Sequence, residues 1–150
     1  MTDAANESWR SNLVTTSDGI RRILEDAKRI AVLGIKPLFD QPAYFVPEYA
    51  QTAGYEIIPV PVYYPELTEL FGSKVYRRVA DVPGDVDIVD VFRRPEHIPP
   101  HVDDIIAKKP KAVWFQSGIR NDEAAERLAR AGIQVVQDHC LMVELRRIGR

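Results

Sequence analysis

The sequence predicts an α/β protein: a Rossmann-like three-layer sandwich with a mainly parallel sheet and helices on both faces. Short apolar runs at 30–33, 55–60, 86–92 and 112–115 are typical of strands that are covered on both faces. Segments with helical spacing or helix caps lie between these runs, and such alternation favours a parallel sheet with right-handed crossovers. A chain of 150 residues is long enough for one sizeable core.

The chain begins with a polar stretch over residues 1–16, which we interpret as an N-terminal arm, and residues 17–150 form the single expected domain. Ser17 is typical of a helix N-cap. The apolar positions that follow are spaced for a helix, which we expect to end near Arg29. These positions are Ile20, Ile23, Leu24 and Ala27.

The stretch from Ile30 to Tyr44 is the segment from which we interpret the rest of the chain. Gly34 ends the first apolar run, and a loop containing two prolines leads to a helix expected over 43–53. A strand, a glycine at its carboxyl end and a helix start together are typical of a nucleotide-phosphate site, although a dinucleotide fingerprint would have three glycines. Because Pro47 is tolerated only within the first turn, we place the helix start between residues 43 and 46.

The second half of the chain continues the alternation. We expect a strand at 55–60 with Pro59 at its exit, a helical turn at 66–71, a short strand at 75–76 and a turn at 81–84. The remaining expected elements are a strand at 86–92, a helix from 98 to about 109, a strand at 112–115, a helix capped by Asn121 and ended by Gly132, a strand at 133–136 and a helix at 139–147.

Composition narrows the function classes. The formal net charge of −2 provides no broad positive field, so we expect neither nucleic acid nor a membrane surface as partner. No apolar run approaches the ~20 residues of a membrane-spanning helix, and Met1–Ser11 lacks a hydrophobic signal segment. With Cys140 as its one cysteine, the chain cannot form an internal disulfide, which favours a cytoplasmic location.

A ligand in such a sheet lies beyond the carboxyl ends of the strands, so the loops at 34–42, 59–64, 92–95 and 116–120 are the segments of interest. Cations and small polar side chains gather there, whereas carboxylates are mostly elsewhere. The residues concerned are Lys36, Gln41, Tyr63, Arg93, Arg94, Ser117 and Arg120. This coincidence across four loops predicts a site for an anionic ligand.

The exit of the second strand argues against NAD. An NAD site usually has an acidic residue there to bind the adenosine ribose, about 20 residues after the glycine loop. Residues 59–62 contain no carboxylate, and Glu56 lies at the other end of the strand. A ribose that carries a phosphate suits this acid-free exit better.

Neither a metal site nor a catalytic site is predicted. His97 and His101 are four residues apart, but two prolines between them place the helix start there. Ser117 lacks the preceding glycine of a nucleophile elbow. Asp87 and Asp90, three apart on a strand, point to opposite faces. We therefore expect no catalytic residue and no enzyme activity.

Several motifs match a known family in order and spacing. They lie at 30–34, 53–60, 72–76, 87–94, 118–125 and 135–141. On these motifs, residues 27–144 resemble the small stand-alone CoA-binding proteins, relatives of the CoA-binding domain of succinyl-CoA synthetase.

The resemblance implies a Rossmann-type fold that binds coenzyme A, with no enzymatic reaction. Its phosphates would lie at Gly34, Lys36 and Gln41, the nucleotide beside Pro59, Val60 and Arg93, and the pantetheine arm near 117–119. The complete set of expected CoA contacts is Gly34, Ile35, Lys36, Pro37, Gln41, Pro42, Pro59, Val60, Phe92, Arg93, Ser117, Gly118 and Ile119.

The chain departs from the family pattern at Lys36, Gln41, Ala43 and Pro61, where the family usually has Ser, Arg, Ser and Asn. These changes remove phosphate donors worth ~1.5–3 kcal/mol each when charged, and Lys36 offers a point charge instead.

The leading hypothesis is a non-catalytic protein that binds CoA or acyl-CoA. The alternatives are an NADP-type oxidoreductase subunit and a regulatory interaction module with a degenerate nucleotide pocket. A further hypothesis is that Cys140 forms a mixed disulfide with CoA under oxidation.

Overall fold

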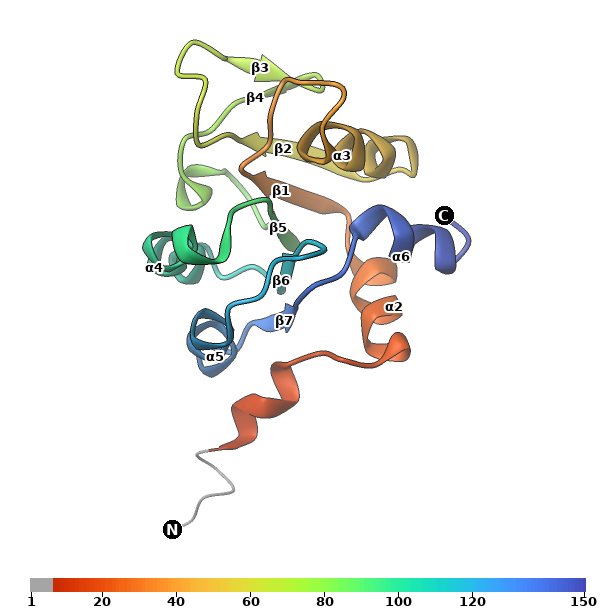
Figure 1. Ribbon diagram of the computed structural model, residues 1–150, viewed down its shortest axis with the longest axis vertical. Coiled ribbons are helices and arrows are strands. Elements are labelled where there is room, and N and C mark those ends of the chain that lie inside the picture. The colour runs from red at the N-terminus through yellow and green to blue at the C-terminus, as the bar shows by residue number, and fades with distance from the viewer. Residues whose placement is uncertain (1–6) are drawn as a thin grey trace.

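A computed structural model describes residues 7–150, so residues 1–6 of the expected arm lie outside the described part. The helices and strands alternate as predicted (Figure 1). In chain order they are η1 (Ser8–Asn12), α2 (Ser17–Asp26), β1 (Arg29–Leu33), α3 (Pro42–Thr52), β2 (Glu56–Val60), β3 (Glu69–Leu70), β4 (Ser73–Lys74), η2 (Val79–Asp81), β5 (Ile88–Val91), η3 (Pro95–His97), α4 (Pro99–Lys108), β6 (Ala112–Phe115), α5 (Asp122–Arg130), β7 (Gln134–Val136) and α6 (Leu141–Arg147).

The main sheet has five parallel strands in the order β2-β1-β5-β6-β7, which confirms the Rossmann-like α/β prediction. The chain moves from β1 to β2 on one side and later returns to place β5 on the other side of β1. Strand order therefore reverses between β1 and β5. In open parallel sheets this switch point is where a crevice for ligands opens.

Helices cover both faces of the sheet, as Figure 1 shows. Strand residues alternate between two buried clusters because successive side chains point to opposite faces. Ile30, Val32 and Trp114 pack on the side of α2, α3 and α6. Ala31 and Phe115 pack on the side of α4 and α5.

A β-hairpin stands where we expected a helical turn at 66–71. Strands β3 and β4 pair antiparallel across a two-residue turn, and they also replace the strand expected at 75–76. Phe71 (φ 55°) and Gly72 (φ 74°) both have positive φ, as a tight hairpin turn of the I′ kind requires.

Three further predictions about local structure were wrong. Helix α3 begins at Pro42, so Pro47 lies in its second turn rather than its first. Pro59 lies inside β2, which tolerates it because β2 is an edge strand. The N-cap of α2 is Thr16, whose hydroxyl accepts a hydrogen bond from Gly19 N, and Ser17 is the first helical residue.

Segments outside the main sheet cover both of its edges. Val14 N donates to Val135 O at 2.9 Å, and Leu13 forms a parallel bridge with Val135, so the chain before α2 lies along β7. At the opposite edge, Tyr76 N donates to Pro59 O at 3.0 Å. Trp9 packs against the cluster on the α4–α5 side and anchors η1.

Two aspartates of the β5 region have opposite environments. The Asp87 carboxylate accepts from Lys28 N (2.8 Å) and Arg29 N (2.9 Å) and lies 3.3 Å from the Lys111 ammonium. Burial acts to raise the pKa of Asp87, but these hydrogen bonds and Lys111 lower it overall. Asp90 is fully buried, and neither of its carboxyl oxygens has a hydrogen-bond partner. Burial raises the pKa of Asp90 well above its usual value.

Within residues 7–150, no helix combines the length and the apolar character needed to cross a membrane.

Candidate functional site

The loops after β1 and β5 approach each other closely at the switch point. Phe92 N donates to Leu33 O at 2.8 Å, and Gly34 N donates to Val60 O at 2.9 Å. Gly34 has φ +88°, and a Cβ built on it would lie 2.3 Å from Phe92 O. Only glycine fits this position. The floor of the crevice at residue 34 is therefore backbone without a side chain.

The loop from β1 returns to the start of α3 and is tied there. Lys36 N donates to Ala43 O at 3.2 Å, and Lys36 Nζ lies 3.5 Å from Gln41 Oε1. Gln41 is the N-cap residue of α3, but its side chain makes no capping hydrogen bond. Gln41, Pro42 and Ala43 line a cavity together with Lys36, so the positive end of the helix dipole borders the crevice beside the lysine.

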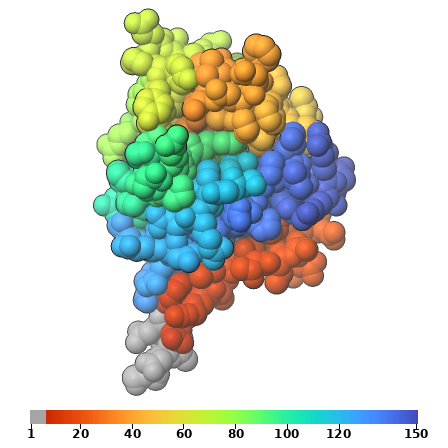
Figure 2. Space-filling model, in the orientation of Figure 1, coloured from red at the N-terminus to blue at the C-terminus, as the bar shows by residue number. Residues whose placement is uncertain are grey.

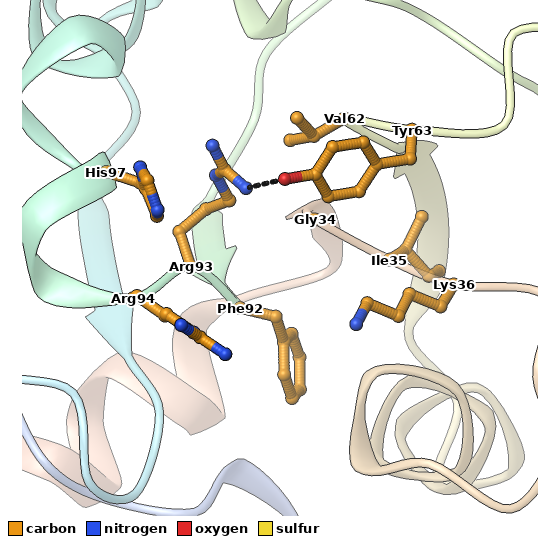
Figure 3. Close-up of a pocket in the computed structure, with 9 residues that line it drawn as sticks. All are labelled: Gly34, Ile35, Lys36, Val62, Tyr63, Phe92, Arg93, Arg94 and His97. Atoms are coloured by element: carbon orange, nitrogen blue, oxygen red, sulfur yellow. Dashed lines mark hydrogen bonds between the residues drawn. The ribbon is translucent and has the colours of Figure 1, made fainter.

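A cavity of about 350 Å³ opens directly over Gly34, and we call it the cationic cavity (Figure 3). Lys36 reaches into it from one side, and Arg93 and Arg94 reach in from the other. The lining residues are Gly34, Ile35, Lys36, Val62, Tyr63, Phe92, Arg93, Arg94 and His97. No carboxylate is among them, so the side chains of this cavity favour an anion.

Tyr63 and Arg93 span the mouth of the cationic cavity. Arg93 Nη1 donates to the Tyr63 hydroxyl at 3.4 Å, and the guanidinium lies 5.6 Å from the centre of the tyrosine ring. This hydrogen bond and the charges of Arg93, Lys36 and Arg94 lower the pKa of the Tyr63 hydroxyl against a small opposing effect of burial. The exposed tyrosine thus contacts the arginine through both its hydroxyl and its ring.

Arg77 fixes the loop that carries Tyr63. Its guanidinium donates to four backbone carbonyls over residues 63–67, those of Tyr63, Tyr64, Pro65 and Leu67. This loop follows β2 and includes Tyr64 with a positive φ of 64°.

A second cavity of about 590 Å³ adjoins the first, and we call it the wide cavity. The two share Lys36, Phe92, Arg93 and Arg94 and so form one crevice. The residues that line only the wide cavity are Gln41, Pro42, Ala43, Phe45, Val46, Pro95, Gln116, Ser117, Gly118, Ile119 and Cys140. In the space-filling view the segments after β1, β5 and β6, coloured orange, green and cyan, adjoin on the face toward the viewer (Figure 2).

Backbone geometry positions the part of the crevice that follows β6. Gly118 N donates to Asp138 Oδ1 at 2.6 Å, and Asp138 itself has φ +60°. The N-cap residue of α5, Asn121, accepts from Ala124 N as expected and also donates to Pro95 O, which joins this loop to the loop after β5.

Most of the expected site residues lie together in the structure. The two cavities are lined by Gly34, Ile35, Lys36, Gln41, Pro42, Phe92, Arg93, Ser117, Gly118 and Ile119. Pro37 lies instead along a separate shallow depression with Tyr64–Leu67. Pro59 and Val60 are buried within β2 and line neither cavity.

Sequence reasoning left several lining residues out of the expected set. Arg94 and Tyr63 belong to the strand-end loops of interest, whereas the sequence suggests only a metal-ligand role to test for His97. Phe45 and Val46 lie in the first turns of α3, which border the crevice, and Cys140 enters because the chain after β7 turns back over β6. Arg120 pairs with Asp122 at 3.1 Å and lies outside both cavities.

Nowhere in the part of the chain that the structure describes do three or more His, Cys, Asp or Glu side chains cluster as a metal site would need. His139 Nδ1 lies 3.3 Å from Glu144 Oε2, and Arg147 pairs with the same carboxylate.

Comparison with known proteins gives a consistent result. The pattern of the CoA binding domain matches residues 28–146. The protein YneT of Bacillus subtilis (strain 168) is 37% identical over 124 residues, which cover 83% of this chain and 90% of YneT.

Solved structures share the fold over nearly the whole chain. A protein of Thermus thermophilus is 41% identical with a TM-score of 0.83, covering 89% of this chain and 99% of that protein. A protein of Pyrococcus horikoshii OT3 is 35% identical with a TM-score of 0.82, covering 89% and 92%.

Proposed function

This chain belongs to the CoA binding domain family, and from that premise we propose that it binds CoA or acyl-CoA without catalysing a reaction. The ligand would lie at the carboxyl ends of the parallel strands, with its phosphates at the loop between β1 and α3.

One observation carries the proposal: three cations with no carboxylate line the cavity over Gly34. Lys36, Arg93 and Arg94 enter it from two different loops. CoA carries a diphosphate and a further phosphate on its ribose, and guanidinium groups bind phosphate in a bidentate manner. The start of α3 and the bare backbone of Gly34 add dipole attraction and close access.

The exit of β2 supports a phosphorylated ribose in preference to that of NAD. Val62 and Tyr63 line the cavity where an NAD site would have its acidic residue. The nearest acidic residue of this strand, Glu56, is exposed at its opposite end and pairs with Arg29 at 3.3 Å.

The non-catalytic part of the proposal is supported by the chemistry of the lining. Neither cavity is lined by a carboxylate, and the one lining thiol, Cys140, has no histidine beside it among the lining residues of the wide cavity. We also propose a cytoplasmic location, supported by the single unpaired cysteine.

Isothermal titration with CoA, dephospho-CoA and NADPH tests the proposal. We expect CoA to bind most tightly, dephospho-CoA at least tenfold more weakly because it lacks one charged phosphate contact, and NADPH more weakly still. Binding of NADPH in preference to CoA would instead favour an oxidoreductase subunit. Failure of all three to bind at millimolar concentration would favour a degenerate pocket.

Arg93→Ala tests the proposed binding site, since Arg93 lines both cavities. Loss of one charge-assisted contact of ~1.5–3 kcal/mol predicts a 10- to 150-fold weaker Kd for CoA. Arg120→Ala is the control, because Arg120 is an exposed arginine of a strand-end loop that pairs with Asp122 outside the crevice. Equal losses in the two variants would contradict the assignment.

A further inference from the structure

The crevice changes character where the wide cavity leaves the cationic one. The two cavities share three cations, but the residues that line only the wide cavity include no charged side chain. Seven of them are apolar or weakly polar: Pro42, Ala43, Phe45, Val46, Pro95, Ile119 and Cys140. A ligand that is anionic at one end and apolar at the other matches this division.

Three side chains of the apolar part are only partly covered by the core. Phe45 and Cys140 are half-buried and pack against the cluster under α3 and α6, whereas Ile119 packs against the opposite cluster. Their remaining surface faces a cavity rather than flat solvent. Concave apolar surface of this kind gains free energy when an apolar group displaces its water.

Three polar side chains also line the wide cavity: Gln41, Gln116 and Ser117. Gln41 is within reach of Lys36, and Ser117 follows β6, so both can serve the amide groups of a pantetheine arm. Gln116 is buried, and its Oε1 already accepts from Leu141 N at 3.2 Å. Phe45, Ile119 and Cys140 themselves present neither an amide nor a charged group to the cavity, so hydrocarbon matches these three side chains better than an amide does.

We propose that the ligand is an acyl-CoA thioester whose acyl chain occupies this apolar part of the wide cavity. The inference rests on the proposed function and narrows it from CoA in general to its acylated forms. The charge of the shared cations fixes the orientation, because the phosphates bind at Lys36, Arg93 and Arg94 and the arm then leads the acyl chain toward Cys140.

Titration of the full-length protein with CoA, acetyl-CoA, butyryl-CoA and hexanoyl-CoA tests this inference. Burial of one methylene tightens binding about fourfold, so we expect butyryl-CoA, which has two more methylenes, to bind about 15-fold more tightly than acetyl-CoA. Free CoA should bind more weakly than both. If free CoA binds as tightly as every acyl-CoA, the inference is overturned while the proposed function stands. If no CoA species binds, the proposed function itself fails.

Cys140→Asn tests the place of the acyl chain. Cys140 is the N-cap residue of α6 without a capping hydrogen bond, and Asn is a favoured N-cap, so this variant suits the fold. It adds a polar amide to the apolar part, and we expect the ratio of acetyl-CoA to butyryl-CoA Kd values to fall below about threefold.

Val143→Asn is the control on the same helix. Val143 is 39% exposed and lines neither cavity, so the ratio of Kd values should stay near about 15-fold. An unchanged ratio in Cys140→Asn would place the acyl chain elsewhere and overturn the inference. The titrations of the wild-type protein with CoA and the three acyl-CoA species test the inference even if neither variant folds.

Discussion

The backbone N–H of Lys36 donates to the carbonyl oxygen of Ala43 at 3.2 Å. In an uninterrupted helix that carbonyl would accept from the residue four positions later, which here is Pro47 and has no N–H. The proline inside α3 thus leaves a carbonyl available to the loop that carries the lysine. Pro47 weakens α3, but it also helps to hold the proposed phosphate loop against this helix.

Pro47→Ala restores a helical donor to Ala43 O and so competes with Lys36 N. A hydrogen bond of about 1 kcal/mol corresponds to a roughly fivefold change in equilibrium. We therefore expect amide exchange at Lys36 to become about fivefold faster and CoA to bind several-fold more weakly. Hydrogen exchange followed by NMR measures the first effect. Unchanged exchange at Lys36 would show that the loop is held by other contacts.

Gly34→Ala should disrupt both the fold and the crevice. The new Cβ would lie 2.3 Å from Phe92 O at a positive φ, so β1 and β5 must move apart. We expect a loss of at least ~3 kcal/mol in the free energy of unfolding, measured by chemical denaturation, and no detectable CoA binding.

Gly72→Ala is the matched control for backbone strain. Gly72 also has a positive φ, +74°, but a Cβ there meets nothing within 4 Å. The expected loss is only ~1–2 kcal/mol, with CoA binding retained. Similar losses for the two glycines would mean that the close approach to Phe92 is not what requires Gly34.

Alkaline pH should weaken CoA binding through Tyr63. The hydrogen bond from Arg93 and the nearby cations lower the pKa of its hydroxyl below 10.0. The phenolate that forms as pH rises pairs with Arg93 and repels phosphate, so the Kd should increase with a midpoint below that pH. In Tyr63→Phe this increase should be absent when both proteins are titrated between pH 7 and 10. Parallel profiles would contradict a role for Tyr63.

Asp90 should make the folded protein less stable as pH rises, which is the opposite of the effect of an aspartate in an ion pair. Its folded-state pKa is raised, so the folded protein keeps a proton that the unfolded chain releases above about pH 4. Stability therefore falls as pH rises from there toward the folded-state pKa, with a slope of up to ~1.4 kcal/mol per pH unit from this group. Asp90→Asn should lack this contribution in urea denaturation at pH 4–7. The same slope in both proteins would refute the assignment.

The sequence alone was informative about the fold because the buried parallel strands have continuous apolar runs. Residues 112–115 were placed without error, and the Asn121 cap was confirmed by its bond to Ala124 N. The hairpin at 69–74 was missed for two reasons. Its strands are too short to show alternation of apolar and polar residues, and its turn requires a positive φ at Phe71, which a phenylalanine does not predict.

The site was less accessible to sequence reasoning. Loop positions after the strands could be found from topology, and Lys36 and Arg93 were found in this way. Phe45 and Val46 could not, because the sequence predicts a helix there but does not show which of its side chains border the crevice. Cys140 lies far along the chain, and only the path after β7 brings it to the crevice.

The pairing of Leu13 and Val14 with β7 has a consequence for how copies of this protein behave in concentrated solution. A bare outer strand is a template on which another chain can add its own strand, and this leads to aggregation. At one border of the sheet the segment before α2 occupies that template, and at the other border Pro59 and the contact from Tyr76 interrupt it. Leu13 and Val14 therefore occupy an edge of the sheet to which a strand of a second chain could otherwise add.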